Sequence, residues 1–186
     1  MIQEKLTFFK EAIKSFKTSG TVTPSSRFLV KRILSKIDFK KSNLIVEYGS
    51  GNGIITKEII KKITPLTTLV CFEINEVFYN ELKKINHKQL IVLNSSAENI
   101  EQEIKKLGYD KVDNFISSLP LTMLPKELAI TIIENSHNVL KEKGRFVQFQ
   151  YSTQFLKPFK LIFNKKVTLD FEPLNLPPAF LYLFEK

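Results

Sequence analysis

Residues 44–56 read LIVEYGSGNGIIT, an apolar run with one acid that is followed by three glycines in five positions. The run Leu44–Tyr48 has the continuous β-branched character of a buried strand, and the residues from Ile54 onward have helical spacing. Glycines between a strand and a helix permit a tight turn and a close approach of the backbone to a ligand, because no Cβ intervenes. The stretch therefore predicts a ligand-binding turn after a buried strand.

Two common phosphate-binding turns do not fit this stretch. A P-loop needs Gly-Lys-Ser/Thr at the start of the helix, and these residues are absent here. The dinucleotide fingerprint needs its third glycine at position 54, which is Ile54. What remains is the pattern E-x-G-x-G-x-G, which does not favour a pyrophosphate ligand.

The rest of the chain alternates strand and helix patterns. The expected strands are 44–48, 69–73, 90–93, 112–117, 145–151, 166–171 and 179–184. The expected helices are 27–37, 55–63, 76–85, 97–107, 126–140 and 153–163. Repeated βα alternation predicts an α/β protein with a doubly wound, Rossmann-like, seven-stranded and mostly parallel sheet, closed by a hairpin of the final strands. We expect an N-terminal helix over 1–20 and one domain over 21–186.

Composition indicates an ordinary globular protein, with 186 residues of which 43% are hydrophobic and 25% charged. The single Cys71 lies in an expected strand, where we expect a buried thiol in a reducing compartment. We see no apolar run of the ~20 residues that span a bilayer, and no signal peptide. We therefore expect a cytoplasmic protein, and we expect no metal.

The positive charge is concentrated near the N-terminus. Residues 1–41 hold ten basic and three acidic residues and so supply +7 of the net +9, which predicts a polyanionic partner, either nucleic acid or an anionic membrane. Apolar residues recur every three or four positions on one stripe of the expected helix, bordered by lysines. The candidate membrane-contacting residues are Lys5, Phe9, Lys10, Ile13, Lys14, Phe16 and Lys17. The alternative is that the stripe packs on the protein core.

The expected strand ends carry the residues that suggest a ligand. Glu47 precedes the glycines, and Glu73 stands at the second strand end, twenty residues past Gly53, where a carboxylate can accept hydrogen bonds from both hydroxyls of a ribose. A glycine turn with a ribose acid predicts a nucleoside ligand without pyrophosphate. S-adenosylmethionine fits this description, because it ends in an amino acid whose ammonium group Glu47 and its loop can approach.

Longer motifs narrow the interpretation. They are FFKEAIKSFKTSGTVTPSS, VEYGSGNGIIT, FEIN, SSLPLTMLP, GRFVQFQYS and NLPPAFLY. With them the chain resembles class I S-adenosylmethionine-dependent methyltransferases, and among these the bacterial phospholipid N-methyltransferases, which convert phosphatidylethanolamine towards phosphatidylcholine and have relatives acting on ornithine lipids. The resemblance implies a membrane-facing N-terminal helix over the site. The cofactor-binding residues that it implies are Ser25, Glu47, Gly49, Ser50, Gly51, Glu73, Ile74, Ser96 and Ala97. The family often has Asp where Ser96 stands.

Two alternatives stay open. Ribosomal RNA adenine N6-dimethyltransferases share the glycine loop, but they carry Asn-Leu-Pro-Tyr after the fourth strand, where the amide binds the adenine amine and the aromatic ring stacks on the base. This chain has Ser118-Leu119-Pro120-Leu121 there, and it stops where that family adds a helical RNA-binding domain. The other alternative is a non-catalytic, lipid-binding methyltransferase fold.

A lipid N-methyltransferase needs mainly to hold a neutral amine in line with the methyl group. The candidate catalytic residues are Tyr151, whose ring can contact the amine, and Ser117 and Ser118, which can line the pocket. The histidines, His87 and His137, lie away from the expected strand ends, so we expect no histidine base. We expect a monomer at the inner face of the cell membrane. Its expected partners are an anionic membrane surface and an amine-headgroup phospholipid, and we do not expect nucleic acid.

Overall fold

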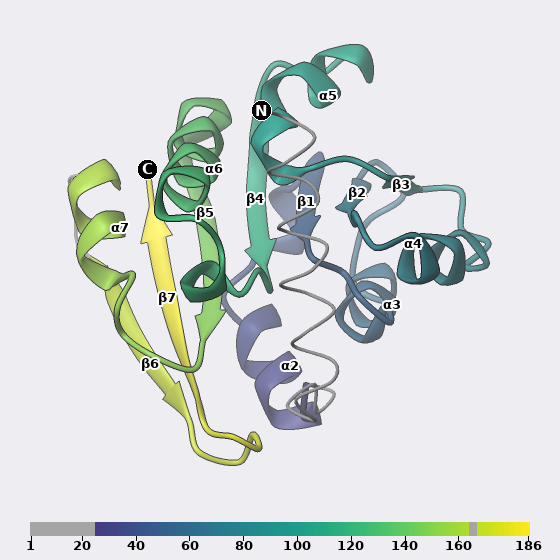
Figure 1. The fold of residues 1–186 in the computed structure, drawn as a ribbon. Helices are drawn as coiled ribbons and strands as arrows, with labels where there is room; N and C mark the ends of the chain where they lie inside the picture. Colours follow the sequence, from purple (N-terminus) through teal and green to yellow (C-terminus); the bar gives the residue numbers. More distant parts are fainter. Residues whose placement is uncertain (1–24, 164–166) are drawn as a thin grey trace.

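The computed structural model describes residues 25–163 and 167–186. Seven strands form one sheet in the order β3-β2-β1-β4-β5-β7-β6 (Figure 1). Strands β1 to β5 are parallel, and β7 is antiparallel to both β5 and β6. The strands are β1 (Leu44–Tyr48), β2 (Thr68–Phe72), β3 (Leu90–Leu93), β4 (Val112–Ser117), β5 (Leu140–Gln150), β6 (Thr168–Glu172) and β7 (Ala179–Glu185). The predicted doubly wound, mostly parallel sheet with a closing hairpin is confirmed.

Helices cover both faces of this sheet. They are α2 (Arg27–Leu34), α3 (Ile54–Ile60), α4 (Glu76–Lys83), α5 (Ile100–Lys106), α6 (Lys126–Val139) and α7 (Leu156–Phe163), with short 3₁₀ turns at Phe39–Lys41, Ala97–Asn99 and Leu121–Met123. Helices α2 and α3 pack into one buried cluster, and α5, α6 and α7 contribute to a second cluster on the other face. Helix α4 lies near α3, toward the β3 side of the molecule (Figure 1).

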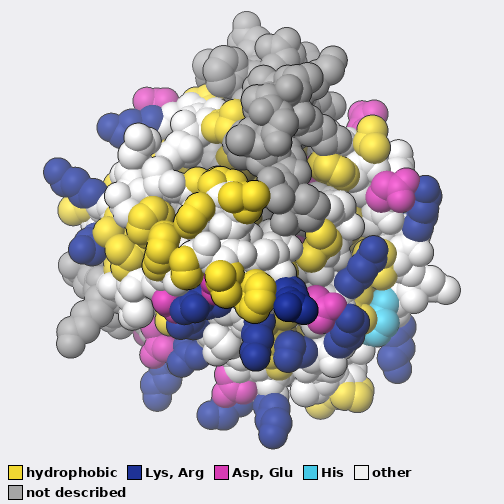
Figure 2. All heavy atoms as spheres, turned by 90° about the horizontal axis from the view of Figure 1, so that it is seen from below, with side chains coloured by type: hydrophobic (Ala, Val, Ile, Leu, Met, Phe, Trp, Pro, Cys, Tyr) yellow, Lys and Arg dark blue, Asp and Glu magenta, His cyan; other side chains and the backbone are white. Residues whose placement is uncertain are grey.

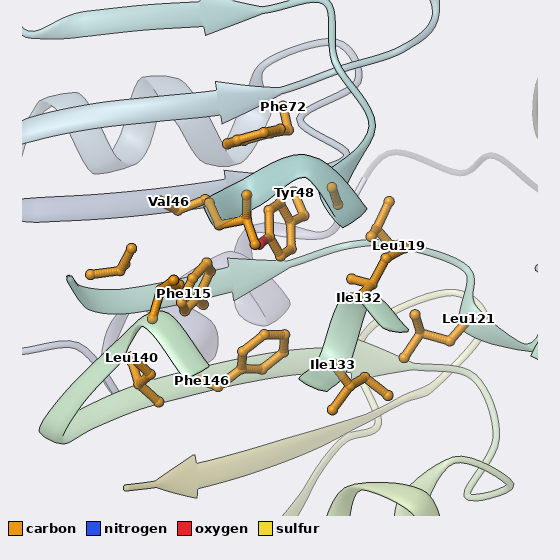
Figure 3. Close-up of a cluster of buried hydrophobic side chains, with 14 of the residues drawn as sticks. Val46, Tyr48, Phe72, Phe115, Leu119, Leu121, Ile132, Ile133, Leu140 and Phe146 are labelled. Carbon is orange, nitrogen blue, oxygen red and sulfur yellow. The ribbon is translucent and has the colours of Figure 1, made fainter. Parts of the chain in front are cut away.

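The middle of the sheet forms the core. All five residues of β1 are buried, because both faces of this central strand are covered by helices. The ring of Tyr48 lies 5.3 Å from that of Phe115, which in turn stacks 5.4 Å from Phe146 (Figure 3). The hydroxyl of Tyr48 lies 3.0 Å from that of Ser136 in α6, so its buried polar group is satisfied.

The sheet order reverses between β1 and β4, which are neighbours although β2 and β3 intervene in sequence. The carboxyl ends of the five parallel strands lie along one edge of the sheet, and ligands of such folds bind at that edge where the order reverses. The turn between β6 and β7, residues 173–178, lies along this same edge (Figure 1). We call this edge, the lower one in Figure 1, the ligand edge.

Some element boundaries differ from those predicted. Strand β5 begins at Leu140, because α6 ends at Val139 and Leu140 pairs at once with Val112, ahead of a register shift between Val112 and Asn114. Helix α2 ends at Leu34, and α7 begins at Leu156. The helix expected from Ala97 starts as a 3₁₀ turn before α5. The expected N-terminal helix over 1–20 lies outside the described residues.

Candidate functional site

The glycine loop connects β1 to α3 at the ligand edge. Gly49, Gly51 and Gly53 have φ angles of +68°, +52° and +76°, which L side chains rarely adopt. A Cβ at Gly49 would lie 3.2 Å from Leu119 Cδ2, and one at Gly53 would lie 3.0 Å from Leu82 Cδ2. Among the described residues beyond its chain neighbours, a Cβ at Gly51 would meet only the Gly49 carbonyl oxygen, 3.9 Å away. Gly49 and Gly53 are therefore needed for packing, whereas Gly51 faces open space that a ligand can use.

Glu73 follows β2 and is bonded directly to this loop. Its carboxylate accepts the Gly51 N–H at 2.9 Å through Oε2 and the Asn75 N–H at 2.8 Å through Oε1, and the side chain is 4% exposed. Each carboxylate oxygen has two lone pairs and can accept more than one hydrogen bond. Asn94, which follows β3, donates to the Glu73 carbonyl at 2.9 Å. The predicted ribose acid is thus held against the glycine loop.

Glu47 is buried beneath the loop. Its Oε2 accepts the Thr56 hydroxyl at 2.7 Å and the Cys71 thiol at 3.3 Å, while Oε1 is buried and has no partner among the described residues. Burial raises the pKa of Glu47 to about 7, and the hydrogen bond from Thr56 opposes this rise. An unpartnered carboxylate oxygen under a glycine loop fits a cationic group, such as the ammonium of S-adenosylmethionine. The expected burial of Cys71 is confirmed, and burial raises the pKa of its thiol.

The raised pKa of Glu47 makes stability depend on pH. Between pH 4.5 and 7 the folded protein binds more protons at this site than the unfolded chain, so stability falls as pH rises through that interval. Glu47→Gln removes this loss of stability, because glutamine does not ionise. The cost of burying the new amide group offsets part of the gain in the free energy of unfolding. We expect the variant to be more stable than the parent by roughly 1–2 kcal/mol at pH 8, since each pKa unit corresponds to ~1.4 kcal/mol.

Urea unfolding of both proteins at pH 5 and pH 8 measures this effect. At pH 5 most of the Glu47 carboxyl groups in the folded protein are protonated, so the difference between the two proteins should shrink there. An equal difference at the two pH values would show that Glu47 does not titrate in this interval.

The loop after β4 lies beside the glycine loop. The Ser118 N–H donates to the Tyr48 carbonyl at 2.9 Å, and Leu119 packs on Gly49. The Ser117 hydroxyl accepts the Leu119 N–H at 3.4 Å inside the turn, and Ser117 is 1% exposed. The Ser118 hydroxyl has no partner among the described residues. Of the two predicted serines, Ser118 is therefore the one we retain as a candidate for contact with an acceptor.

Two glutamines of β5 hold this loop in place, and sequence reasoning missed them. Gln148 and Gln150 donate to the Leu119 carbonyl at 3.1 Å and 2.7 Å, and both side chains are buried. Since a carbonyl has two lone pairs, the Leu119 oxygen is already used twice. The signal was present in FVQFQ: two polar residues two apart share one face of a buried strand and need partners there.

The other predicted residues are distributed along the ligand edge. Ile74, Ser96 and Ala97 are buried after β2 and β3, and Ser50 is buried within the glycine loop. Tyr151 packs against the buried cluster on the α2 side of the sheet, with its ring 6.0 Å from that of Phe149. Ser25 precedes α2 and is half-buried.

The environment of Tyr151 limits what its hydroxyl can do. Burial raises the pKa of Tyr151, and a hydrogen bond with Asn175 opposes this. The phenol therefore stays neutral near pH 7 and does not serve as a phenolate base.

The predicted membrane-contacting residues all lie outside the described part of the chain. Within that part, no three His, Cys, Asp or Glu side chains are arranged to hold a metal.

Comparison with known proteins agrees with this geometry. The model of the family described as ribosomal RNA adenine dimethylase matches residues 24–142. The chain belongs to this family. The prediction of an S-adenosylmethionine-dependent class I methyltransferase is thereby confirmed.

Two similar proteins have names that point to different substrates. The ornithine lipid N-methyltransferase of Singulisphaera acidiphila is 28% identical over 94% of this chain and 92% of the relative. The ribosomal RNA small subunit methyltransferase A of Mycoplasma mycoides is 28% identical over 83% of this chain, which spans 65% of that relative.

Solved structures share the fold at low identity. The 1,6-didemethyltoxoflavin-N1-methyltransferase of Burkholderia thailandensis has a TM-score of 0.72 at 12% identity, covering 99% of this chain and 89% of the other. The precorrin-6y C5,15-methyltransferase of Geobacter metallireducens has a TM-score of 0.68 at 14% identity, covering 89% and 93%. Both likenesses bear on the fold alone.

Proposed function

We propose that this protein transfers a methyl group from S-adenosylmethionine to the amine of a lipid headgroup, with phosphatidylethanolamine, on the way to phosphatidylcholine, as the first candidate acceptor. The observation that carries the proposal is the loop after β4. Where the ribosomal RNA enzymes carry an aromatic residue that stacks on the flipped base, this chain has Leu121, which is 1% exposed. Figure 3 labels Leu121 among the buried hydrophobic side chains.

The polar groups of the same loop also favour a small amine over an adenine. The amide that binds the adenine amine is replaced by Ser118, and the Leu119 carbonyl is already engaged by Gln148 and Gln150. The Ser118 hydroxyl oxygen, buried and without a partner among the described residues, suits an aliphatic amine that needs few directed contacts. The relative with a lipid substrate in its name is also matched along 92% of its length.

The residues of the ligand edge can hold the cofactor in a defined order. The open space beside Gly51 lets the cofactor approach the backbone of the glycine loop. Glu73 can accept hydrogen bonds from the ribose hydroxyls. The Glu47 oxygen that has no partner among the described residues can face the ammonium group. S-adenosylmethionine, when bound, supplies a methyl group that its sulfonium already activates. The chain therefore has to position a neutral amine rather than create a nucleophile.

The amine reaches its neutral form without a histidine. His137 lies in the last turn of α6 with its ring against Phe163, and His87 lies in the segment before β3. Neither lies at the carboxyl ends of the strands, so the ammonium proton leaves to water. The Ser118 hydroxyl then accepts an N–H of the neutral amine and fixes its orientation.

Ser118→Ala should lower kcat for lipid methylation by about tenfold, the equivalent of one lost hydrogen bond of ~1.4 kcal/mol. Cofactor affinity should not change, because Ser118 contacts the acceptor rather than the cofactor. The matched control is Ser35→Ala, which removes an exposed hydroxyl at the end of α2 that donates to the Arg32 carbonyl. An unchanged kcat in Ser118→Ala would remove this serine from the acceptor site.

Transfer of labelled methyl groups to separate acceptors tests the proposal. Purified protein is incubated with labelled S-adenosylmethionine and, in parallel tubes, with anionic vesicles containing phosphatidylethanolamine, with vesicles containing ornithine lipid, and with ribosomal RNA. We expect label in lipid. The family match makes ribosomal RNA the second candidate, and label in RNA but not in either lipid would overturn the proposal.

A further inference from the structure

Exposed apolar side chains gather at one end of the ligand edge. Leu174 and Leu176 in the turn after β6 are 61% and 74% exposed, and Phe171 and Phe28 are 43% and 39% exposed. Figure 2, which looks at the molecule from below, shows hydrophobic side chains together on this face with Lys and Arg side chains beside them. We call Phe28, Leu174 and Leu176 the apolar edge. Phe171 lies on the other face of β6 from α2, because its neighbours Asp170 and Glu172 face Arg32. Exposed apolar side chains that gather in this way mark an interaction site.

Buried polar contacts fix the turn that presents the two leucines. Asn175, between them, is 2% exposed; its Oδ1 accepts the Ser26 N–H at 2.9 Å and its Nδ2 donates to the Pro177 carbonyl at 2.7 Å. Glu172 accepts the Leu174 N–H at 3.0 Å. The turn is thus tied to the start of α2 through its inward residues, while Leu174 and Leu176 face solvent.

Helix α2 makes a second set of contacts with this region and carries exposed basic side chains. Arg32 donates to Glu172 at 2.6 Å and to Asp170 at 3.0 Å, which fastens the helix to β6. Arg27 and Lys31 are exposed one turn apart, and the Arg27 guanidinium lies 4.9 Å from the Phe28 ring. No carboxylate in the described part of the chain forms an ion pair with either residue. These two bases therefore remain available to an anionic partner.

We propose that the apolar edge enters the headgroup region of an anionic bilayer, with Arg27 and Lys31 at the lipid phosphates. Apolar side chains bordered by bases match a surface whose charged layer covers an apolar interior, whereas RNA offers phosphates without that interior. The inference rests on the proposed lipid methylation, because the same edge of the sheet carries Ser118. A protein docked in this way receives amine headgroups from the bilayer plane.

Vesicle binding by full-length variants tests the surface. Leu174→Ser with Leu176→Ser should weaken binding to vesicles of phosphatidylglycerol and phosphatidylethanolamine by more than about tenfold, because both leucines lose their apolar contact with the bilayer. The matched control is Leu66→Ser, an 83% exposed leucine before β2 at the opposite edge of the sheet, which should bind as the parent does. S-adenosylmethionine affinity should stay unchanged in both variants. Pure phosphatidylcholine vesicles should bind the parent weakly, since their surface has no net negative charge to attract Arg27 and Lys31.

Three outcomes would count against the surface. Binding of the double variant equal to that of the parent would overturn it, whatever the methylation result. A double variant that binds vesicles normally but converts a dimer to a monomer in light scattering would assign the apolar edge to a second copy of the chain. Equal loss in Leu66→Ser would show a nonspecific effect.

A detergent-dispersed amine lipid separates this inference from the proposed function. Methylation of that lipid by the parent and by the double variant alike would support both ideas, since dispersed substrate does not require docking. If the parent methylates no dispersed lipid, lipid methylation fails, while the vesicle result still decides the surface.

Discussion

Gly51→Val is expected to weaken S-adenosylmethionine binding by more than about 100-fold, ~3 kcal/mol, which is the largest effect we expect from a single substitution. The φ of Gly51 is +52°, and beyond its chain neighbours the nearest described atom to a Cβ there is the Gly49 carbonyl oxygen, 3.9 Å away. That space lies beside the N–H that Glu73 accepts, where the cofactor has to approach the backbone. Titration calorimetry with the cofactor measures the loss.

Gly108→Val is the matched control for backbone strain. Gly108 has φ +83°, and beyond its chain neighbours no described atom lies within 4 Å of a Cβ there, so both substitutions carry the same kind of left-handed penalty, ~1–2 kcal/mol. Thermal melts should therefore show similar destabilisation in the two variants. Gly108→Val should keep parental cofactor affinity because it lies in the turn after α5. Equal cofactor binding by both variants would show that Gly51 does not border the ligand.

Glu73→Ala is expected to weaken cofactor binding by ~2–3 kcal/mol, since charge-assisted hydrogen bonds contribute about 1.5–3 kcal/mol each before compensation. The structure adds a second cause, because the same carboxylate holds the N–H groups of Gly51 and Asn75. Loss of these bonds leaves the glycine loop less well ordered for the ligand.

Two further variants separate these causes. Glu73→Gln can still accept hydrogen bonds but lacks the charge, so it should retain more affinity than Glu73→Ala. Glu81→Ala removes an exposed carboxylate of α4 that pairs with Lys84 and should bind the cofactor as the parent does. If Glu73→Ala binds normally by calorimetry, the ribose lies elsewhere.

The glycine loop and its neighbouring acids were predictable because their signals are local. Strand β1 matches the expected Leu44–Tyr48, and Glu73 stands directly after β2. A continuous apolar run indicates a strand that is buried on both faces of the sheet. Glycines indicate a turn with positive φ angles, which other residues rarely adopt. What this pattern did not reveal is that the Glu73 oxygens already accept two backbone N–H groups, since that depends on the loop conformation.

Contacts between distant segments account for most of what was missed. Arg32 is bonded to Glu172 across 140 positions, and Asn175 is bonded to Ser26 across 149. Such pairs join charged or polar residues that are common in any sequence, so neither partner indicates the other. Gln148 and Gln150 could be recognised as buried polar residues in need of partners, but the Leu119 carbonyl could not be named from spacing alone.

The most direct test of lipid methylation is a competition between acceptors in one tube. Purified protein, S-adenosylmethionine, ribosomal RNA and anionic vesicles with phosphatidylethanolamine and ornithine lipid are incubated together, and mass spectrometry locates the added methyl groups. We predict methylated headgroup amines and unmodified adenines, with no transfer by Gly51→Val. Dimethylated adenine beside unchanged lipids would contradict the account and assign the chain to RNA.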